Sequence, residues 1–299
     1  MPLLYLAKVN LNSRIFDVYN DVLEIDDVSS LIYQTIKDGI SYSRLEKKNY
    51  TDTHGNIVHY SSDSKYTFRE ISKKDNVITG KLVRTFDKPT EKLDEYKNKM
   101  ITTYITESVS ISFYYDVFKE LLTFCERQSF GYNQFTRTFA QMLNICTCKY
   151  EFEIFLQKDR NLLDEKLKTL KVVQKLKARL IPPNSNADDI QTIRSETDYM
   201  RQCEDTNSRK ISIEYTSDNM NMEAKVMKDI MNAVSQGYGD ITAIGINNNN
   251  RTASINSSQE AAFTNNIKDN IDKKGFIDES KNLIERFLLY HATKSYRRN

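Results

Sequence analysis

The sequence has little glycine and little proline, with 8 Gly and 4 Pro among its 299 residues. Glycine-rich loops that cradle phosphates and flexible linkers both need these residues, so nucleotide-binding folds built on such loops are disfavoured. No apolar run approaches the ~20 residues of a membrane-spanning helix, and the first basic residues follow the short apolar start, the reverse of the order in a signal peptide. We therefore expect a cytoplasmic protein with no membrane partner.

Histidine and cysteine are also scarce. The chain has three His and four Cys, and no two cysteines form a CxxC pair. Structural zinc sites need about four such ligands at characteristic spacings, so we predict no metal site; no cofactor motif is present either, and we expect no cofactor. Cys146 and Cys148 fit a redox pair, half of a soft-metal site or two free thiols, and a reducing cytosol favours the free thiols.

The chain has no strong charge of either sign. Its 43 Lys and Arg residues balance 41 Asp and Glu residues, which leaves a formal net charge of +2, so any binding to nucleic acid must be local. Two basic stretches are candidates for phosphate contact: Lys294, Arg297 and Arg298 near the C-terminus, and Lys81 with Arg84 in a predicted strand. The C-terminal stretch also fits a solvated helix end, because the helix dipole favours cations there.

Aromatic residues are abundant. With 18 Tyr, 14 Phe and 39% hydrophobic residues, the chain has enough apolar surface for two cores. Residues 1–146 predict an antiparallel, β-rich domain, because short segments rich in Tyr, Thr, Val and Phe alternate with turn residues. The charged interval 87–99 predicts a loop or a short exposed helix. Phe135, Phe139 and Leu143 recur at the helical period, which predicts a helix whose aromatic face lies in the core.

Residues 147–258 predict a second domain of alternating strands and helices, and residues 259–299 predict a helical C-terminal extension. Because hairpins are frequent and glycine is scarce, the chain fits the α+β class better than a doubly wound parallel sheet. One helix face of the extension is apolar and must dock on the chain's own body or on another chain. This candidate partner-docking face consists of Leu283, Ile284, Phe287 and Leu288.

Three carboxylates of the second domain are candidates for catalysis. Glu151 and Glu153 share one face of a predicted strand, and Glu214 lies on a later strand close to Asp218. Such carboxylates can hold a divalent metal and position an attacking water, as in a nuclease. The competing interpretation, which we favour, is structural: the basic residues of the strand at 176–181 pair with carboxylates across the polar face of a sheet.

Several segments carry a family resemblance. ISFYYDVFKELLTFCERQSFGYNQF at 111–135, followed by a helix, by YEFEIFL at 150–156 and by KARLIPPN at 177–184, resembles uncharacterised bacterial proteins carried by prophages and other mobile elements. No catalytic signature comes with these segments, so no functional residue follows from them. The resemblance implies a setting, because genes of this kind take part in conflict between bacteria and phages.

The sequence therefore favours a non-enzymatic interaction protein that acts in anti-phage defence or in phage counter-defence. We expect it to act through a protein partner or through nucleic acid, and to self-associate as a homo-oligomer. The alternative is a nuclease-like effector enzyme that uses the carboxylates of the C-terminal sheet.

Overall fold

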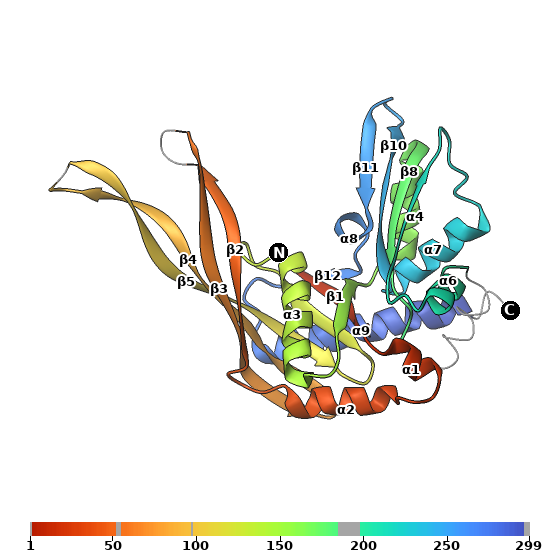
Figure 1. Ribbon diagram of the computed structural model, residues 1–299, viewed down its shortest axis with the longest axis horizontal. Coiled ribbons are helices and arrows are strands. Elements are labelled where there is room, and N and C mark those ends of the chain that lie inside the picture. Colours follow the sequence, from red (N-terminus) through yellow and green to blue (C-terminus); the bar gives the residue numbers. More distant parts are fainter. Residues whose placement is uncertain (1, 52–54, 97, 185–197, 296–299) are drawn as a thin grey trace.

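The computed structural model describes residues 2–51, 55–96, 98–184 and 198–295. The chain forms a large and a small antiparallel sheet that stand side by side, and helices pack on both (Figure 1). The mixed α+β class predicted from the sequence is confirmed. Within the described residues, no helix is long and apolar enough to cross a membrane.

The large sheet is built around β1 (Leu3–Leu11), which pairs with three other strands. β6 (Leu121–Cys125) runs along one side of β1, whereas β12 (Thr264–Asn266) and β7 (Phe152–Leu156) share the other side. Because neighbouring strands cover both edges of β1 and core clusters cover both of its faces, every one of its residues after the first is buried. Beyond β6 the sheet continues as β5 (Lys99–Asp116), β4 (Val77–Asp94), β3 (Ile57–Lys74) and β2 (Ser41–Thr51).

Two helices cover one face of the large sheet, which we call its inner face: α2 (Ile25–Thr35) and α3 (Tyr132–Thr147). The short helix α1 (Ile15–Tyr19) contacts both cores, with Val18 on that of the large sheet and Phe16 and Tyr19 on that of the small sheet. Phe139 of α3 packs edge-on against Phe113 and Phe68 of the sheet, with ring centroids 5.0 Å and 5.5 Å apart. The predicted aromatic core face of this helix is therefore confirmed. Removing a ring from such a core costs about 3–5 kcal/mol.

The C-terminal helix α9 (Lys273–Ser295) covers the opposite, outer face of the large sheet. Its residues Leu283, Ile284 and Phe287 are between 1% and 6% exposed and pack in one cluster with residues of β1 and β6. The apolar face therefore docks on the chain's own body. The prediction that these three residues dock a partner is wrong, because another chain cannot reach them. Leu288 is 41% exposed.

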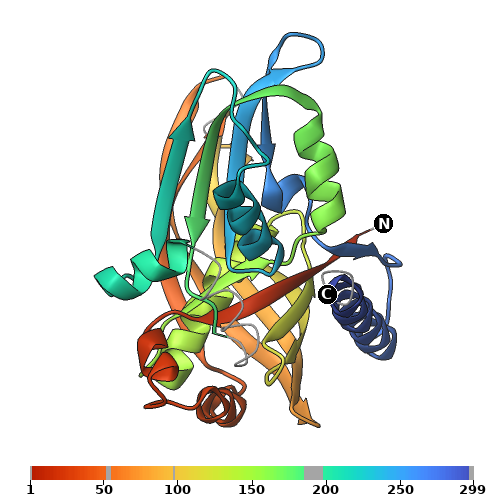
Figure 2. The same cartoon turned by 90° about the vertical axis from the view of Figure 1, so that its right-hand side faces the viewer.

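The small sheet has the strand order β11-β10-β8-β9. Along β8, Leu176 and Ala178 lie in a core with the helices, whereas Lys175, Lys177 and Arg179 point away from it. The sheet thus has one face covered by helices, seen in Figure 2, and one open polar face. Its elements are β8 (Leu170–Leu180), β9 (Ile211–Thr216), β10 (Gly239–Asn247) and β11 (Thr252–Asn256), with α4 (Arg160–Lys168), α6 (Asp198–Thr206), α7 (Lys225–Ser235) and α8 (Ser257–Glu260).

The boundary between the two sheets falls after β7 and not after residue 146. β7 pairs with β1 and so belongs to the large sheet, although it follows the predicted boundary in the sequence. The predicted extension at 259–299 also returns to the large sheet, because β12 pairs with β1 and α9 covers the outer face. Both pairings join residues far apart in the chain, which local patterns do not reveal.

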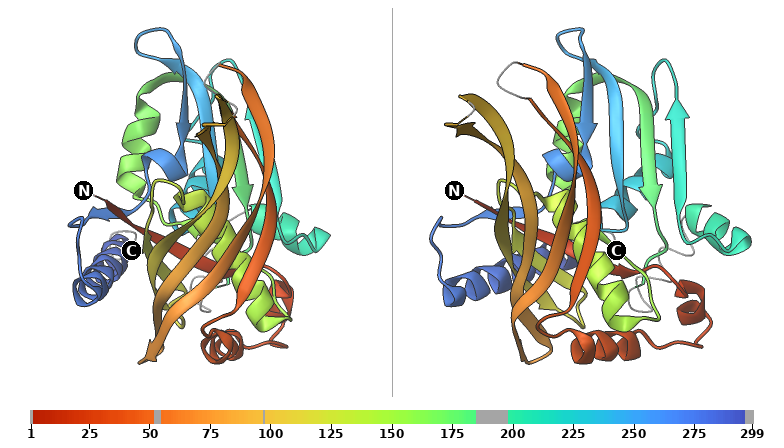
Figure 3. Two further views of the ribbon diagram at one scale, coloured as in Figure 1. Left: turned by 90° about the vertical axis from the view of Figure 1, so that its left-hand side faces the viewer. Right: turned by 60° about the vertical axis from the view of Figure 1, so that its left-hand side comes forward.

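Two ribbons of the large sheet project beyond the helices (Figures 1 and 3). β3 and β4 pair only as far as Lys65 and Thr85, and beyond this point β2–β3 and β4–β5 continue as separate two-stranded ribbons. Residues 87–94 and Lys99 of the charged interval belong to the paired strands of the β4–β5 ribbon, so the predicted loop or helix is wrong for them. Alternating charges fit an exposed ribbon as well as a loop, because neither is buried.

Candidate functional site

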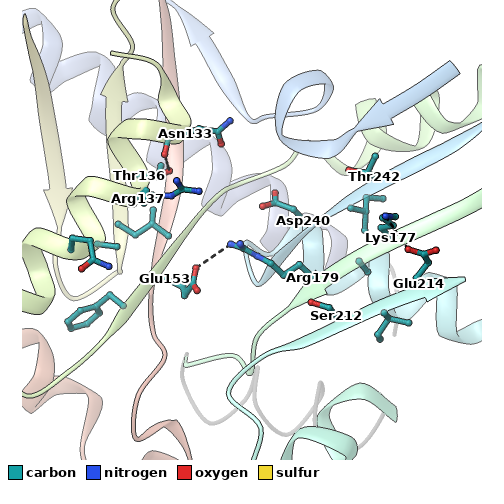
Figure 4. Close-up of a pocket in the computed structure, with 17 residues that line it drawn as sticks. Asn133, Thr136, Arg137, Glu153, Lys177, Arg179, Ser212, Glu214, Asp240 and Thr242 are labelled. Carbon is teal, nitrogen blue, oxygen red and sulfur yellow. Dashed lines mark hydrogen bonds and ion pairs between the residues drawn. The ribbon is translucent and has the colours of Figure 1, made fainter. Parts of the chain in front are cut away.

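A cleft of about 750 Å³ separates α3 from the open face of the small sheet. α3 and β7 form one wall, and β8, β9 and β10 form the other (Figure 4). Its size lies within the range of binding sites in proteins. The cleft is therefore the first place to examine for a binding function.

Helical periodicity explains which residues α3 presents to the cleft. Phe135 and Phe139 are buried on one face of the helix, and Asn133, Arg137 and Gln141, spaced by four, are exposed on the other. The α3 wall of the cleft is polar because the aromatic residues lie on the opposite face of the helix.

Two of the carboxylates proposed for catalysis lie on or beside β7 and are held by cations. Glu153 lies 3.2 Å from Arg179 and 3.3 Å from Lys210, and Glu151 lies 2.8 Å from Arg209. The Glu153–Arg179 pair crosses the cleft between the two sheets (Figure 4). The expected pairing with the basic residues of β8 is confirmed for Glu153, but across two sheets instead of within one.

The third candidate, Glu214 on β9, pairs within the small sheet. Its carboxylate lies 2.5 Å from Lys175 and 3.1 Å from Lys177 on the neighbouring strand β8. Hydrogen bonds from Lys175 and then from Lys177 lower the pKa of Glu214. This is a cross-strand ion pair of the kind that the structural interpretation predicts.

Asp240 on β10 is a further carboxylate that lines the cleft. Lys158, whose side chain is fully buried, lies 2.7 Å from one carboxylate oxygen, and the Ser258 hydroxyl donates a hydrogen bond to the same oxygen. Burial by itself raises the pKa of Asp240, but the charge and hydrogen bond of Lys158 and the bond from Ser258 outweigh burial and lower it. The negative charge of Asp240 is therefore already compensated by Lys158.

The charges that line the cleft balance. Three cations line it, Arg137, Lys177 and Arg179, together with three carboxylates, Glu153, Glu214 and Asp240. Each carboxylate also has a cation partner outside the lining: Lys210, Lys175 and Lys158 in turn. The carboxylates are therefore already compensated, which leaves the lining cations less tightly bound to them.

Arg137 stands between two hollows. A second hollow of about 790 Å³, lined by β2 and α3, shares Asn133 and Arg137 with the cleft and also contains Arg44. Arg137 and Arg44 are exposed. In the part of the chain that the structure describes, neither guanidinium has a hydrogen bond or an ion pair. Both cations are therefore available to a ligand.

Arg84, one of the predicted phosphate contacts, is buried. It is 3% exposed, and its guanidinium donates hydrogen bonds to Glu46 at 2.7 Å and to the Ser129 carbonyl at 2.5 Å. The prediction that Arg84 contacts nucleic acid is wrong, because this side chain ties β2, β4 and the segment before α3 together.

The other predicted phosphate contacts lie outside the cleft. Lys81 pairs with Glu70 at 2.7 Å and lines a hollow beside the start of α9. Lys294 lies near the end of α9, while Arg297 and Arg298 lie outside the described residues. Sequence reasoning instead missed Arg137. The spacing of four along α3 was a usable signal for Arg137.

The described residues contain no group of three or more His, Cys, Asp or Glu side chains that could hold a metal ion. All four cysteines are free thiols, and Cys125 and Cys203 among them are buried.

Comparison with known protein families completes the description of the site. Residues 34–278, more than half of the chain, match DUF4747, a domain of unknown function. The chain belongs to the DUF4747 family. The residues that form the cleft lie within the DUF4747 match, whereas β1 precedes it. No curated protein matches the chain.

Proposed function

We propose that this DUF4747 protein is a non-enzymatic interaction protein that holds nucleic acid in the cleft between α3 and the small sheet. The position of Arg137 is the observation that supports the proposal. This exposed cation, which has no ion-pair partner among the described residues, lines both hollows, and Lys177 and Arg179 lie on the opposite wall of the cleft. Phosphates are the anions that such cations bind with little regard to base sequence.

The ion pairs in the cleft do not oppose this proposal. The side chains of Lys177 and Arg179 are 55% and 44% exposed, and their carboxylate partners are also partly exposed. Exposed pairs of this kind contribute about 0–1 kcal/mol each, so either cation can exchange its carboxylate for a phosphate at little cost. Arg137 makes the first contact in this arrangement, and Lys177 and Arg179 extend it along the sheet.

The experiment is a binding titration with labelled single-stranded DNA, duplex DNA and RNA, repeated at several salt concentrations. We expect binding that weakens as salt rises. Arg137→Glu weakens it about tenfold or more and lowers the salt dependence by about one phosphate contact. Lys281→Glu is the matched control, since it makes the same charge change at an exposed position of α9, outside the cleft. If no nucleic acid binds at low salt, or if both variants bind equally, the proposal fails.

A nuclease-like enzyme is the second candidate. It is favoured by the place of Glu153 in the same cleft, but the cations beside Glu153 and Glu214 compete with any metal for these carboxylates. Incubating the protein with plasmid and total RNA, with Mg²⁺, Mn²⁺ or chelator, separates the two functions. We expect no cleavage. Cleavage that Glu153→Gln abolishes and Glu151→Gln leaves intact establishes the nuclease instead.

The biological setting is part of the same proposal. A place in the cytoplasm is supported by the lack of an apolar run of about 20 residues. A role in anti-phage defence or counter-defence is supported by the resemblance of the segments at 111–135, 150–156 and 177–184 to prophage proteins. A protein partner and self-association belong to the proposal because a non-enzymatic protein acts through what it binds. Plating phages on cells with and without the gene tests the setting. We expect a change in plating efficiency that Arg137→Glu removes.

A further inference from the structure

The far half of the β4–β5 ribbon has apolar side chains but no core. None of the described residues from 87 to 110 is buried, although the two strands stay paired to their ends. Five exposed large hydrophobic residues of the described chain lie on this ribbon, in the 13-residue stretch from 93 to 105: Leu93, Tyr96, Met100, Tyr104 and Ile105. A two-stranded ribbon is at best marginally stable alone in water, so this half of the ribbon favours a covering partner.

The two edges of the ribbon differ in how well they resist pairing. On the edge away from β4, no described strand pairs with β5 between Lys99 and Ser112, since β6 joins only at Phe113. This stretch has no proline or glycine and is rich in β-branched residues, which makes it an unprotected edge. The free edge of β4 carries Pro89 between lysines, a combination that blocks pairing.

We propose that two copies of the chain pair through β5, antiparallel and about a two-fold axis, so that their ribbons form one four-stranded sheet. An antiparallel strand can pair with its own copy, which gives the self-complementary interface that a symmetric dimer requires. The backbone groups on the open edges of both copies are then satisfied.

The sequence of β5 fits one register of this pairing. With Thr103 opposite Thr103 of the second copy, Ile101 stands opposite Ile105, and Lys99 stands opposite Glu107. These residues alternate along the strand and so lie on one face. The register therefore makes two Lys–Glu pairs and two Ile–Ile pairs, and places no like charges opposite each other. This charge complementarity between identical strands selects a second copy as the partner.

The ion pair already present in the ribbon is compatible with the dimer. Glu107 lies 3.3 Å from Lys88 on β4, and both side chains are partly exposed, at 39% and 55%. One carboxylate oxygen can stay with Lys88 while the other accepts from Lys99 of the second copy.

The test is the mass of the full chain in solution, measured by light scattering after size-exclusion chromatography at up to ~100 μM, where even a weak dimer with Kd near 10 μM is mostly assembled. We expect twice the chain mass of 34.9 kDa. Ile105→Lys restores the monomer, because it puts a lysine at the centre of the contact. Leu93→Lys is the matched control: it lies on β4 of the same ribbon and is 50% exposed against 51% for Ile105, and it remains a dimer.

Charge reversal tests the register. Lys99→Glu and Glu107→Lys each weaken the dimer, because each puts like charges opposite one another, and the double variant regains the mass of the wild type. A wild-type monomer at the highest concentration overturns the proposal, as does a dimer that survives Ile105→Lys. Because β5 lies outside the cleft, the Ile105→Lys monomer still binds nucleic acid if the proposed function holds, so the two proposals fail separately.

Discussion

Two sets of charged side chains join the large sheet to the small one, and they differ in exposure. In the buried set, Lys8 of β1 donates a hydrogen bond to the Tyr238 hydroxyl at 2.9 Å and lies 3.7 Å from Glu120. The other oxygen of Glu120 accepts a hydrogen bond from Asn184 at 2.5 Å. These groups bring residues of both sheets together where water is excluded.

The exposed set is the cleft. Glu153 and Arg179 also join the two sheets, but their side chains are 27% and 44% exposed. A buried charge without its partner costs several kcal/mol, whereas an exposed pair is worth little and can be exchanged. The comparison teaches that buried polar contacts fix the two sheets together in one place, whereas exposed charges remain free to bind a ligand in another.

The largest expected effect comes from removing a fully buried cation. Lys158→Ala leaves Asp240 partly buried without its partner, and we expect a loss of about 3–5 kcal/mol in the free energy of unfolding, measured by chemical denaturation. Lys177→Ala in the cleft is the control, with a loss of less than about 1 kcal/mol. Equal losses for the two variants would remove the distinction between buried and exposed charge.

The next effect is a pH dependence at Glu120. Burial raises the pKa of this carboxyl to about 7 from its ordinary 4.5, and the opposing effect of Lys8 is smaller. A raised pKa means that the folded state binds the proton more tightly, so the contribution of Glu120 is fully present below pH 4.5 and is lost as the pH rises through 7. The loss is on the order of 3 kcal/mol.

Glu120→Gln tests this effect because glutamine does not titrate. We expect wild type to lose stability relative to this variant between pH 4.5 and pH 7, measured by denaturation at a series of pH values. Glu151→Gln, at a carboxylate that is 59% exposed, serves as the control and changes stability by less than about 1 kcal/mol throughout. A constant difference between wild type and Glu120→Gln contradicts the prediction.

The smallest effect on stability is expected at Arg179. Arg179→Ala breaks the exposed pair with Glu153, so the free energy of unfolding falls by less than about 1 kcal/mol. The same variant weakens nucleic-acid binding, because one phosphate contact is removed. A large loss of stability without a loss of binding would show that the exposed pair holds the sheets together instead of serving a ligand.

Local patterns in the sequence predicted the elements whose own residues decide their structure. The aromatic face of α3 and the alternation along β8 were predicted correctly. The helical period puts Phe139 on the buried face of α3, and the strand period puts Lys177 on the exposed face of β8, without reference to the rest of the chain. The far half of the β4–β5 ribbon was missed because no described element covers it, so its strands lack the buried alternation that reveals a strand.

The candidate site was harder to predict than the elements. The sequence around Arg84 and Arg137 does not show which of the two is buried. Only the fold places Arg84 against Glu46 in the interior and Arg137 at the cleft. The carboxylates Glu153 and Glu214 were identified as candidates, but their cation partners come from strands distant in the chain, and such sites are recognised by geometry.

The pairing of β1 with β12 has a consequence for the synthesis of the protein. β6 and β7 pair with β1 early in synthesis, but the pairing of Leu3 with Asn266 requires more than 260 further residues, a delay of roughly 15–50 s at ordinary rates of translation. During that delay the apolar residues of β1 lack part of their final cover, a situation that invites aggregation. We therefore expect a chaperone that shields β1 during synthesis to raise the yield of folded protein.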